Sequence, residues 1–433
     1  MHALTVIALC LQAVGTYFIW PSRWNIPAHL SLGFCVTAYL VPGLLTNVWS
    51  GFDERTTTLY MQINVLGALT LLLGLLAGSR LIVFKRLHRA FKRLYQSDSL
   101  QAACMSRIQK IGLYAVIGMI LAYLIMGFVP MFAEDPLSAK QFKNQYFEPY
   151  YRAAYLFRGS FSLLVVAIPL LFTVWWIVRR PKPLLIALSA VLLITLSLAR
   201  QSSAMGLLTF IGFLAARSRR GSRWFIVLAA VIFPLGSAGY LLLGLLTGVE
   251  SLTAIYSADS IADIIGSGAP DIFDSLSFLN GFQDVNTFTY GRTFFGGLIP
   301  GNYMWNPSVW TITYDNLGAD ISELTTGGLR FSTALWGYCN FGWIGVVLLP
   351  FASGFVNGTW IRSLRSMPMD KSLLASAMVL TIYATLGAQL ASFYVLSIHS
   401  LPSIACALYV AFGWRARRRR RRLATSSPQV ASA

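Results

Sequence analysis

The chain has 433 residues, of which 56% are hydrophobic and only 12% are charged, and its mean hydropathy is +0.62. This composition excludes a soluble globular protein, which needs a polar surface around its core. The formal charge of +18 could indicate a nucleic-acid-binding protein. The basic residues cluster in short segments between apolar stretches, however, so nucleic-acid binding is not expected.

Several apolar stretches approach or exceed the ~18 residues that cross a lipid bilayer. We therefore expect an all-α polytopic membrane protein with about eleven transmembrane helices, within a range of ten to twelve. The first stretch lacks a basic leader and a clear cleavage site, which indicates a retained helix rather than a signal peptide. The spans are predicted at 3–20, 28–48, 61–84, 111–132, 159–178, 183–199, 203–216, 224–247, 334–356, 372–394 and 400–414.

Charges between these spans predict their orientation. One face holds 26 of the 34 lysines and arginines, and the other holds fourteen of the sixteen acids. The basic face is expected to be cytoplasmic, with the N-terminus outside and the C-terminus inside. Residues 1–414 then form a single transmembrane domain. The arginine-rich tail, 415–433, is expected to be disordered and to lie against anionic lipid headgroups. The basic segments are Arg23, 80–110, 179–182, 217–223, 362–371 and 415–422.

Two long segments fall on the outer face, 133–158 and 248–333, and the second has about 86 residues. Around 257–279, Ile, Phe and Leu recur at helical spacing with Asp between them, which predicts amphipathic helices along the membrane surface. The rest of this loop is rich in Gly, Trp, Tyr, Pro and Asn and is expected to be ordered but irregular.

Arginines on the outer face are the most informative residues, because positive charge is depleted there. Arg200 lies in the short connection ARQSSAMG, where it either extends to the headgroups or serves a function. A guanidinium binds phosphate oxygens bidentately, so Arg158, Arg292 and Arg330 are also candidates. For Arg152 we expect an ordinary salt bridge. We predict that Arg200, Arg292 and Arg330, together with Arg158, converge on one cavity that holds an anionic phosphate.

Other features are less specific. Tyr303 and Trp305 could stack on sugar rings or belong to an interfacial aromatic belt. The five cysteines have no metal-ligand or redox spacing and are expected to be packing residues. Gly74-x-x-x-Gly78 and Gly354-x-x-x-Gly358 are common helix-packing patterns. The sequence has no Walker A motif, no HExxH motif and no histidine in either long outer segment.

Two stretches carry a family resemblance, GRTFFGGLIPGNYMWNP (291–307) and TTGGLRFSTALWGYCNFGWIG (325–345). Together with ARQSS (199–203) and the layout of spans and loops, they resemble the Wzy-type O-antigen polymerase family. The residues that match its pattern are Gly291-Arg292-Thr293, Pro300, Gly327-Gly328, Ser332, Asn340-Phe341-Gly342 and Gly345.

The resemblance implies a GT-C-like membrane glycosyltransferase. It would join undecaprenyl-pyrophosphate-linked oligosaccharide repeat units at the periplasmic face of a bacterial inner membrane, without a metal, a nucleotide sugar or another cofactor. It also implies a chain-length co-polymerase as a partner, besides the lipids of the membrane. Arg200, Arg292 and Arg330 would be catalytic, and Arg158, Tyr303 and Trp305 would bind substrate. Asp320 or Glu323 could accept the proton of the acceptor hydroxyl.

Two alternatives stay open. An O-antigen ligase would move the same glycan onto lipid A-core, but that family usually has a functional histidine in the large outer loop, and 248–333 contains none. A lipid-linked oligosaccharide flippase or other transporter usually has short loops and a basic cavity within its spans. The product itself stays open among O-antigen, capsule and exopolysaccharide.

Overall fold

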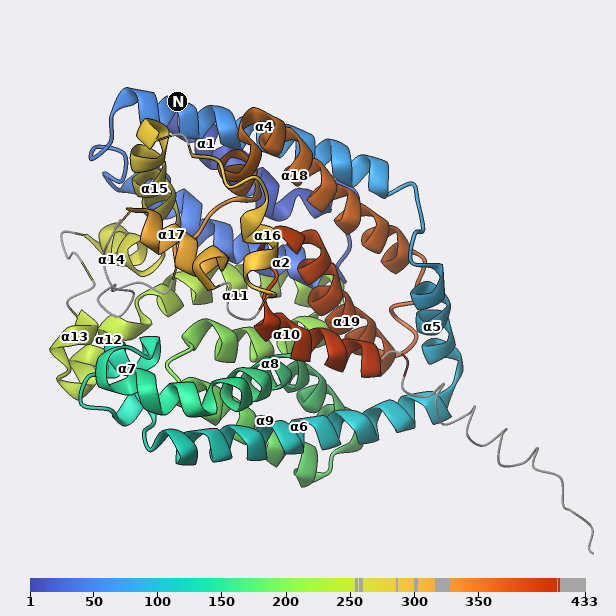
Figure 1. Ribbon diagram of the computed structural model, residues 1–433. Helices are drawn as coiled ribbons and strands as arrows, with labels where there is room; N and C mark the ends of the chain where they lie inside the picture. The colour runs from blue at the N-terminus through green and yellow to red at the C-terminus, as the bar shows by residue number, and fades with distance from the viewer. Residues whose placement is uncertain are drawn as a thin grey trace, which may run out of the picture.

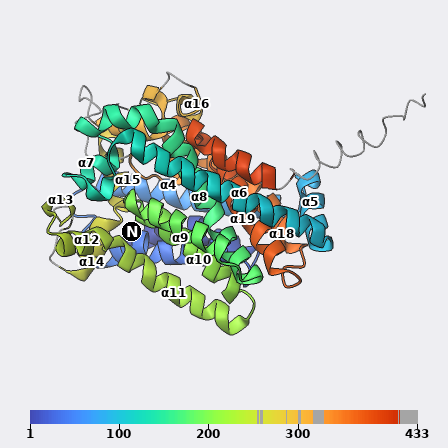
Figure 2. The ribbon, with the colours of Figure 1, turned by 90° about the horizontal axis from the view of Figure 1, so that it is seen from below.

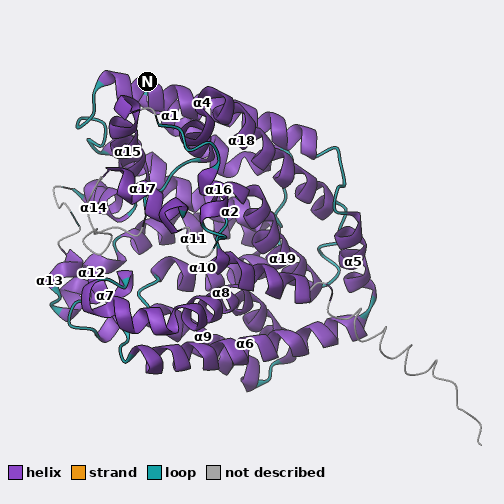
Figure 3. Ribbon diagram, viewed as in Figure 1, coloured by secondary structure: helices purple, strands orange, loops and turns teal. Residues whose placement is uncertain are grey.

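The computed structural model describes residues 1–253, 256, 260–285, 287–299, 303–315, 328–410 and 412. All regular structure in these residues is helical, with no strand among them (Figure 3). The predicted all-α architecture is therefore confirmed. The basic tail, 415–433, lies outside the described residues.

Six helices are long and apolar enough to cross a membrane, which makes the chain a multi-pass membrane protein. The first of them, Ile26–Leu45, contains α2 (Ile26–Cys35), a π-helical turn η2 (Val36–Leu40) and α3 (Val41–Leu45). A bent pair, α11 (Arg219–Ser237) and α12 (Gly239–Thr247), would make a seventh span. The other five are α4 (Glu54–Gly78), α6 (Asp98–Met126), α8 (Phe147–Val178) with its preceding turn η4 (Asn144–Tyr146), α18 (Thr333–Arg365) and α19 (Leu373–Ala391).

Shorter apolar helices cover the four remaining predicted spans. Each of the eleven stretches thus coincides with an apolar helix, although only six or seven meet the length of a full span. One boundary matters for function: α10 begins at Arg200, so this arginine is the first residue of a helix rather than part of a loop. The short helices are α1 (His2–Val14) with η1 (Gly15–Phe18), α9 (Pro181–Leu196), α10 (Arg200–Ala215) and Leu401–Val410.

Helices α4 and α18 lie side by side along much of their length (Figure 1). Their two small-residue patterns face each other, because a Cβ on Gly74 would clash with the Phe351 carbonyl and one on Gly354 with the Leu71 carbonyl. Glycine therefore allows the two backbones to touch, which is how membrane helices gain close packing without a hydrophobic driving force.

The basic segments within the described residues gather at one end of the bundle. Arg23 forms an ion pair of 2.6 Å with Asp370 and donates to the Arg217 carbonyl at 3.0 Å, which ties three of these segments together. The basic helix α5 (Lys85–Gln96) lies at this end (Figures 1 and 2). The opposite end holds α7 (Pro136–Gln141), α13 (Glu250–Thr253), α14 (Ile261–Gly268) and α15 (Asp271–Val285). We call these the basic end and the acidic end. The charge segregation seen in the sequence thus corresponds to two physical ends of the molecule.

At the acidic end, the structure differs from the prediction for both long segments. Residues 147–158 are the first turns of α8, so the predicted loop 133–158 ends much earlier. The described residues of the large segment are mostly in short helices, and these include α16 (Arg292–Gly296), η5 (Tyr303–Trp305) and α17 (Pro307–Asp315) in the part that was expected to be irregular. They also include α13, α14 and α15.

Helix α15 is also not a surface helix. The side chains of Ile272, Leu276, Leu279 and Phe282 are fully buried. They pack in a cluster with residues of α4, α17 and α18, including Tyr60, Trp310 and Trp336. The helical spacing was correctly predicted, but the apolar face is covered by protein rather than by membrane.

Candidate functional site

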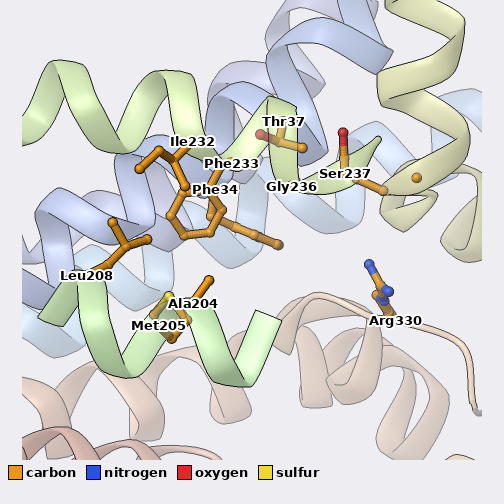
Figure 4. A pocket seen from close by; sticks show the side chains of 12 residues that line it. Phe34, Thr37, Ala204, Met205, Leu208, Ile232, Phe233, Gly236, Ser237 and Arg330 are labelled. Carbon is orange, nitrogen blue, oxygen red and sulfur yellow. The ribbon is translucent and has the colours of Figure 1, made fainter. Parts of the chain in front are cut away.

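An open cavity lies between the membrane helices α2, α10 and α11, close to the short helix α14. Its walls are largely apolar, and among the described residues Arg330 is the only charged one that lines it. Figure 4 shows Arg330 at one edge of the cavity, apart from the apolar side chains, with its guanidinium directed toward the side of Ser237. The apolar lining residues are Phe34, Ala204, Met205, Leu208, Ile232 and Phe233.

Arg330 is held in place by the first turns of α15. Its Nη1 donates to Oδ2 of Asp271 at 2.9 Å, and its backbone N–H donates to Oδ2 of Asp274 at 3.4 Å. The Ser275 hydroxyl donates to the Arg330 carbonyl at 2.9 Å. The Arg330 side chain is still 50% exposed, whereas that of Asp271 is only 9% exposed. One side of the guanidinium is therefore fixed, and the other remains accessible.

Burial sets the charges of this group. Burial raises the pKa of Asp271, and the positive charge of Arg330 offsets part of that rise. Burial also raises the pKa of Asp274, to about 6. Burial alone would lower the pKa of Arg330, but the nearby Asp271 and Asp274 carboxylates raise it overall. The guanidinium therefore stays charged, while Asp274 can gain or lose a proton close to neutral pH.

These features give the cavity an amphipathic character. A guanidinium has five N–H donors, and Asp271 is the only side chain bonded to that of Arg330 among the described residues. The free donors can bind phosphate oxygens bidentately. The apolar walls suit a hydrocarbon chain. Asp274 does not line the cavity, but it is hydrogen-bonded to the backbone of Arg330 and can act as a proton acceptor.

Arg200 lies near the same cavity by its backbone position. It is the first residue of α10, one helical turn before the lining residues Ala204 and Met205. Its side chain is outside the described part of the structure. The backbone of Arg200 thus lies near the cavity that Arg330 lines, and its convergence with Arg330 on a phosphate stays a prediction.

Arg292 and Arg158 do not line this cavity. The guanidinium carbon of Arg292 lies 5.0 Å from the centre of the Trp305 ring, on short elements of the large segment. Arg158 donates from Nε to the Tyr150 hydroxyl at 2.8 Å. The predicted convergence of all four arginines is therefore not seen, because aromatic partners hold these two elsewhere. Both side chains are exposed.

The other predicted residues fall as follows. Arg152 forms an exposed ion pair with Glu148 at 3.3 Å, as expected. The backbone of Tyr303 is in η5, but its side chain is not described in the structure. Asp320 and Glu323 lie outside the described residues. The five cysteines are free thiols.

The two stretches that carry the family resemblance meet at Asn340. Its fully buried Oδ1 accepts hydrogen bonds from the Thr289 hydroxyl, from the Gly291 N–H at 3.1 Å and from the Thr293 hydroxyl at 3.0 Å. Its Nδ2 donates to the Trp336 carbonyl at 2.9 Å. One amide thus fixes the Gly-Arg-Thr turn against the first half of α18, and it thereby positions Arg292.

Helix α18 is broken directly after Asn340. Phe341 and Gly342 have non-helical backbone angles, and Gly342 has φ +58° and ψ −144°, a conformation open to glycine alone. A Cβ on Gly342 would also come within 3.2 Å of the Phe288 ring. The Asn-Phe-Gly motif therefore interrupts a membrane helix, and at such a break backbone groups and side chains are available to form a site.

Sequence reasoning missed Asp271 and Asp274. Two acids spaced three residues apart, with apolar residues at helical spacing around them, were the available signal, because a buried carboxylate needs a cationic partner. No group of three or more His, Cys, Asp or Glu side chains in the described residues could hold a metal ion. Comparison with known proteins gave no matching family model, no matching curated protein and no matching solved structure.

Proposed function

We propose that this protein is a membrane glycosyltransferase that polymerises lipid-pyrophosphate-linked oligosaccharide repeat units into a bacterial surface polysaccharide. The observation that carries the proposal is the position of Arg330, a half-exposed guanidinium at the edge of an apolar cavity between membrane helices. A lipid pyrophosphate has the same two parts, an anionic head and a hydrocarbon chain. The resemblance to Wzy-type polymerases supports the same substrate.

The proposed topology places the acidic end in the periplasm and the basic end in the cytoplasm of a bacterial inner membrane. Its basis is the concentration of lysine and arginine at one end. All eleven apolar helices then belong to the membrane domain, in a GT-C-like arrangement. The short ones, such as α10, would enter the bilayer in contact with longer neighbours.

In the proposed reaction, the carrier chain occupies the apolar cavity and the pyrophosphate binds Arg330 and Arg200. An acceptor hydroxyl attacks the anomeric carbon of the donor sugar, and the bond from that carbon to the pyrophosphate oxygen breaks. Asp274 accepts the hydroxyl proton in its ionised form, above a pH of about 6. The fixed guanidinium charges stabilise the negative charge that builds on the leaving pyrophosphate.

A polar recess at the acidic end suits the acceptor glycan. Among its lining residues are Arg55, Gln62, Gln283 and Tyr338. Gln283 donates to the Thr56 hydroxyl at 2.6 Å, but its Oε1 is buried without a partner in the described residues. Gln283 lies twelve residues after Asp271 on α15, roughly 18 Å along the helix, a distance that an oligosaccharide can bridge.

Deletion of the gene tests the proposal in the cell. We expect single repeat units to remain on the carrier or the acceptor while long polymer disappears. Loss of single units from the acceptor would support a ligase instead. Accumulation of units on the cytoplasmic leaflet would support a flippase, for which a cavity between membrane helices is also suitable.

A further inference from the structure

Another cavity lies at the basic end, far from Arg330. It is a groove between the start of α5, the two helices α18 and α19, and the helix Leu401–Val410. Three basic residues, Lys85, Arg86 and Arg89, line it at the α5 side. The remaining walls are largely apolar and include Phe84, Trp360, Leu386, Leu390, Ile404 and Leu408.

The positive charge of this groove is not neutralised by the protein. No ion pair or hydrogen bond involves the side chains of Lys85, Arg86 or Arg89 in the described part of the chain, and all three are exposed. Helix α5 contains no acid, and no side chain caps its first turn. The N–H groups of that turn add a partial positive charge on the same side.

The α5 wall of the groove is firmly attached to the bundle. Leu87, Phe91 and Leu94 are buried, and the Tyr95 hydroxyl lies 2.9 Å from the Ser376 hydroxyl on α19. The basic side chains are thus presented from a fixed helix, at the boundary where an amphipathic helix meets lipid headgroups.

Trp360 gives a second sign that a polar ligand group belongs in the groove. Its ring packs against Phe84 at 5.0 Å and is only 2% exposed. Its Nε1–H has no acceptor among the described residues. Buried indole N–H groups usually find a partner, and an ester oxygen of a lipid could supply it after a small movement of the wall.

We propose that this groove is a binding site for an anionic phospholipid of the cytoplasmic leaflet. The phosphate lies against Lys85, Arg86 and Arg89, and an acyl chain follows the apolar wall toward Leu390 and Leu408. A free phosphate would leave the apolar wall uncovered, and a zwitterionic lipid would bring an additional positive charge to the basic cluster. The site is independent of the proposed glycosyltransferase activity.

Native mass spectrometry of the purified full-length protein with phosphatidylglycerol or phosphatidylcholine tests this site. The chain offers a matched pair of variants, because α5 carries one Lys-Arg pair in the groove and another, Lys92-Arg93, that does not line it. We expect Lys85→Gln with Arg86→Gln to weaken phosphatidylglycerol retention about tenfold or more. Lys92→Gln with Arg93→Gln should weaken it less than about threefold.

Two further arms identify the occupant. Leu408→Trp should fill the groove and displace the lipid without a change in charge, and glycerol phosphate should not compete with the bound lipid. An equal loss of phosphatidylglycerol retention in the two double variants would overturn the proposal, because it would indicate general electrostatic attraction to the protein surface. Equal retention of phosphatidylcholine, or displacement by glycerol phosphate, would overturn it as well. Unchanged thermal unfolding of the variants serves as the folding control.

Discussion

The carboxylate of Asp271 lies 2.9 Å from Nη1 of Arg330, although the two residues are 59 positions apart in the chain. This pair connects the start of α15 to the segment that leads into α18. Because Asp271 is buried and Arg330 is half exposed, the acid fixes the guanidinium while much of it stays open to the cavity. This is the geometry that a preorganised anion site requires.

Arg330→Ala should lower polymer formation on the order of 100-fold, because one preorganised donor at a developing negative charge is lost. Arg330→Lys should recover only part of the rate, since ammonium keeps the charge but not the planar fork. Initial rates of polymer formation by purified protein give the measurement. Arg152→Ala is the control, because its ion pair with Glu148 is fully at the surface. Equal rates for Arg330→Ala and the wild type would remove Arg330 from the site.

The pKa of Asp274 makes stability depend on pH. It is raised from an ordinary 3.8 to about 6 in the folded protein, so folding favours the protonated acid. Its contribution to stability is therefore fully present below pH ~4 and is lost as the pH rises through ~6. Asp274→Asn, which is neutral at every pH, should gain in melting temperature relative to the wild type between pH 4 and pH 7. Thermal unfolding in detergent measures this, and a constant difference would show that Asp274 is not perturbed.

Asn340→Ala should destabilise the acidic end, because three donors lose their shared buried acceptor. At roughly 1 kcal/mol for each hydrogen bond, the expected loss in free energy of unfolding is about 2–3 kcal/mol. Asn340→Asp keeps the acceptor and should lose less. Asn47→Ala, at an exposed position, is the control in the same denaturation experiment. A loss no larger than that control would mean that Asn340 does not hold the two stretches together.

The helices could be predicted because membrane spans have a strong sequence signal. Each predicted stretch coincides with an apolar helix, and the charge pattern matches the two ends of the bundle. Helix ends were less predictable. Phe147 begins a long helix inside a polar and aromatic segment that was predicted to be a loop. Arg200 is the first residue of α10, although its charge placed it in a predicted connection between two spans. Packing against neighbouring helices decides such boundaries, and hydropathy does not contain that information.

The site was only partly predictable. The depletion of lysine and arginine on the acidic face drew attention to the few arginines that remain there, and one of them, Arg330, lines the cavity. Its partners Asp271 and Asp274 could not be assigned, because long-range pairing between α15 and the α18 segment has no local sequence signal. The same limit applies to Arg292, whose contact with Trp305 depends on how the short helices fold back.

The proposed orientation makes a separate prediction. A reporter enzyme fused after Gly301 should be active only in its periplasmic form, and one fused at the C-terminus only in its cytoplasmic form. The reason is the excess of lysine and arginine at the basic end. Activity of both fusions on the same side of the membrane would contradict the topology.

The most direct test of the account is a reaction of the purified protein in proteoliposomes with a lipid-pyrophosphate-linked repeat unit. We predict a ladder of products at whole multiples of the unit, with one free lipid pyrophosphate released for each new glycosidic bond. The ladder should be lost in Arg330→Ala. If the units cross the bilayer but are never joined, the protein is a transporter, and the proposed function is wrong.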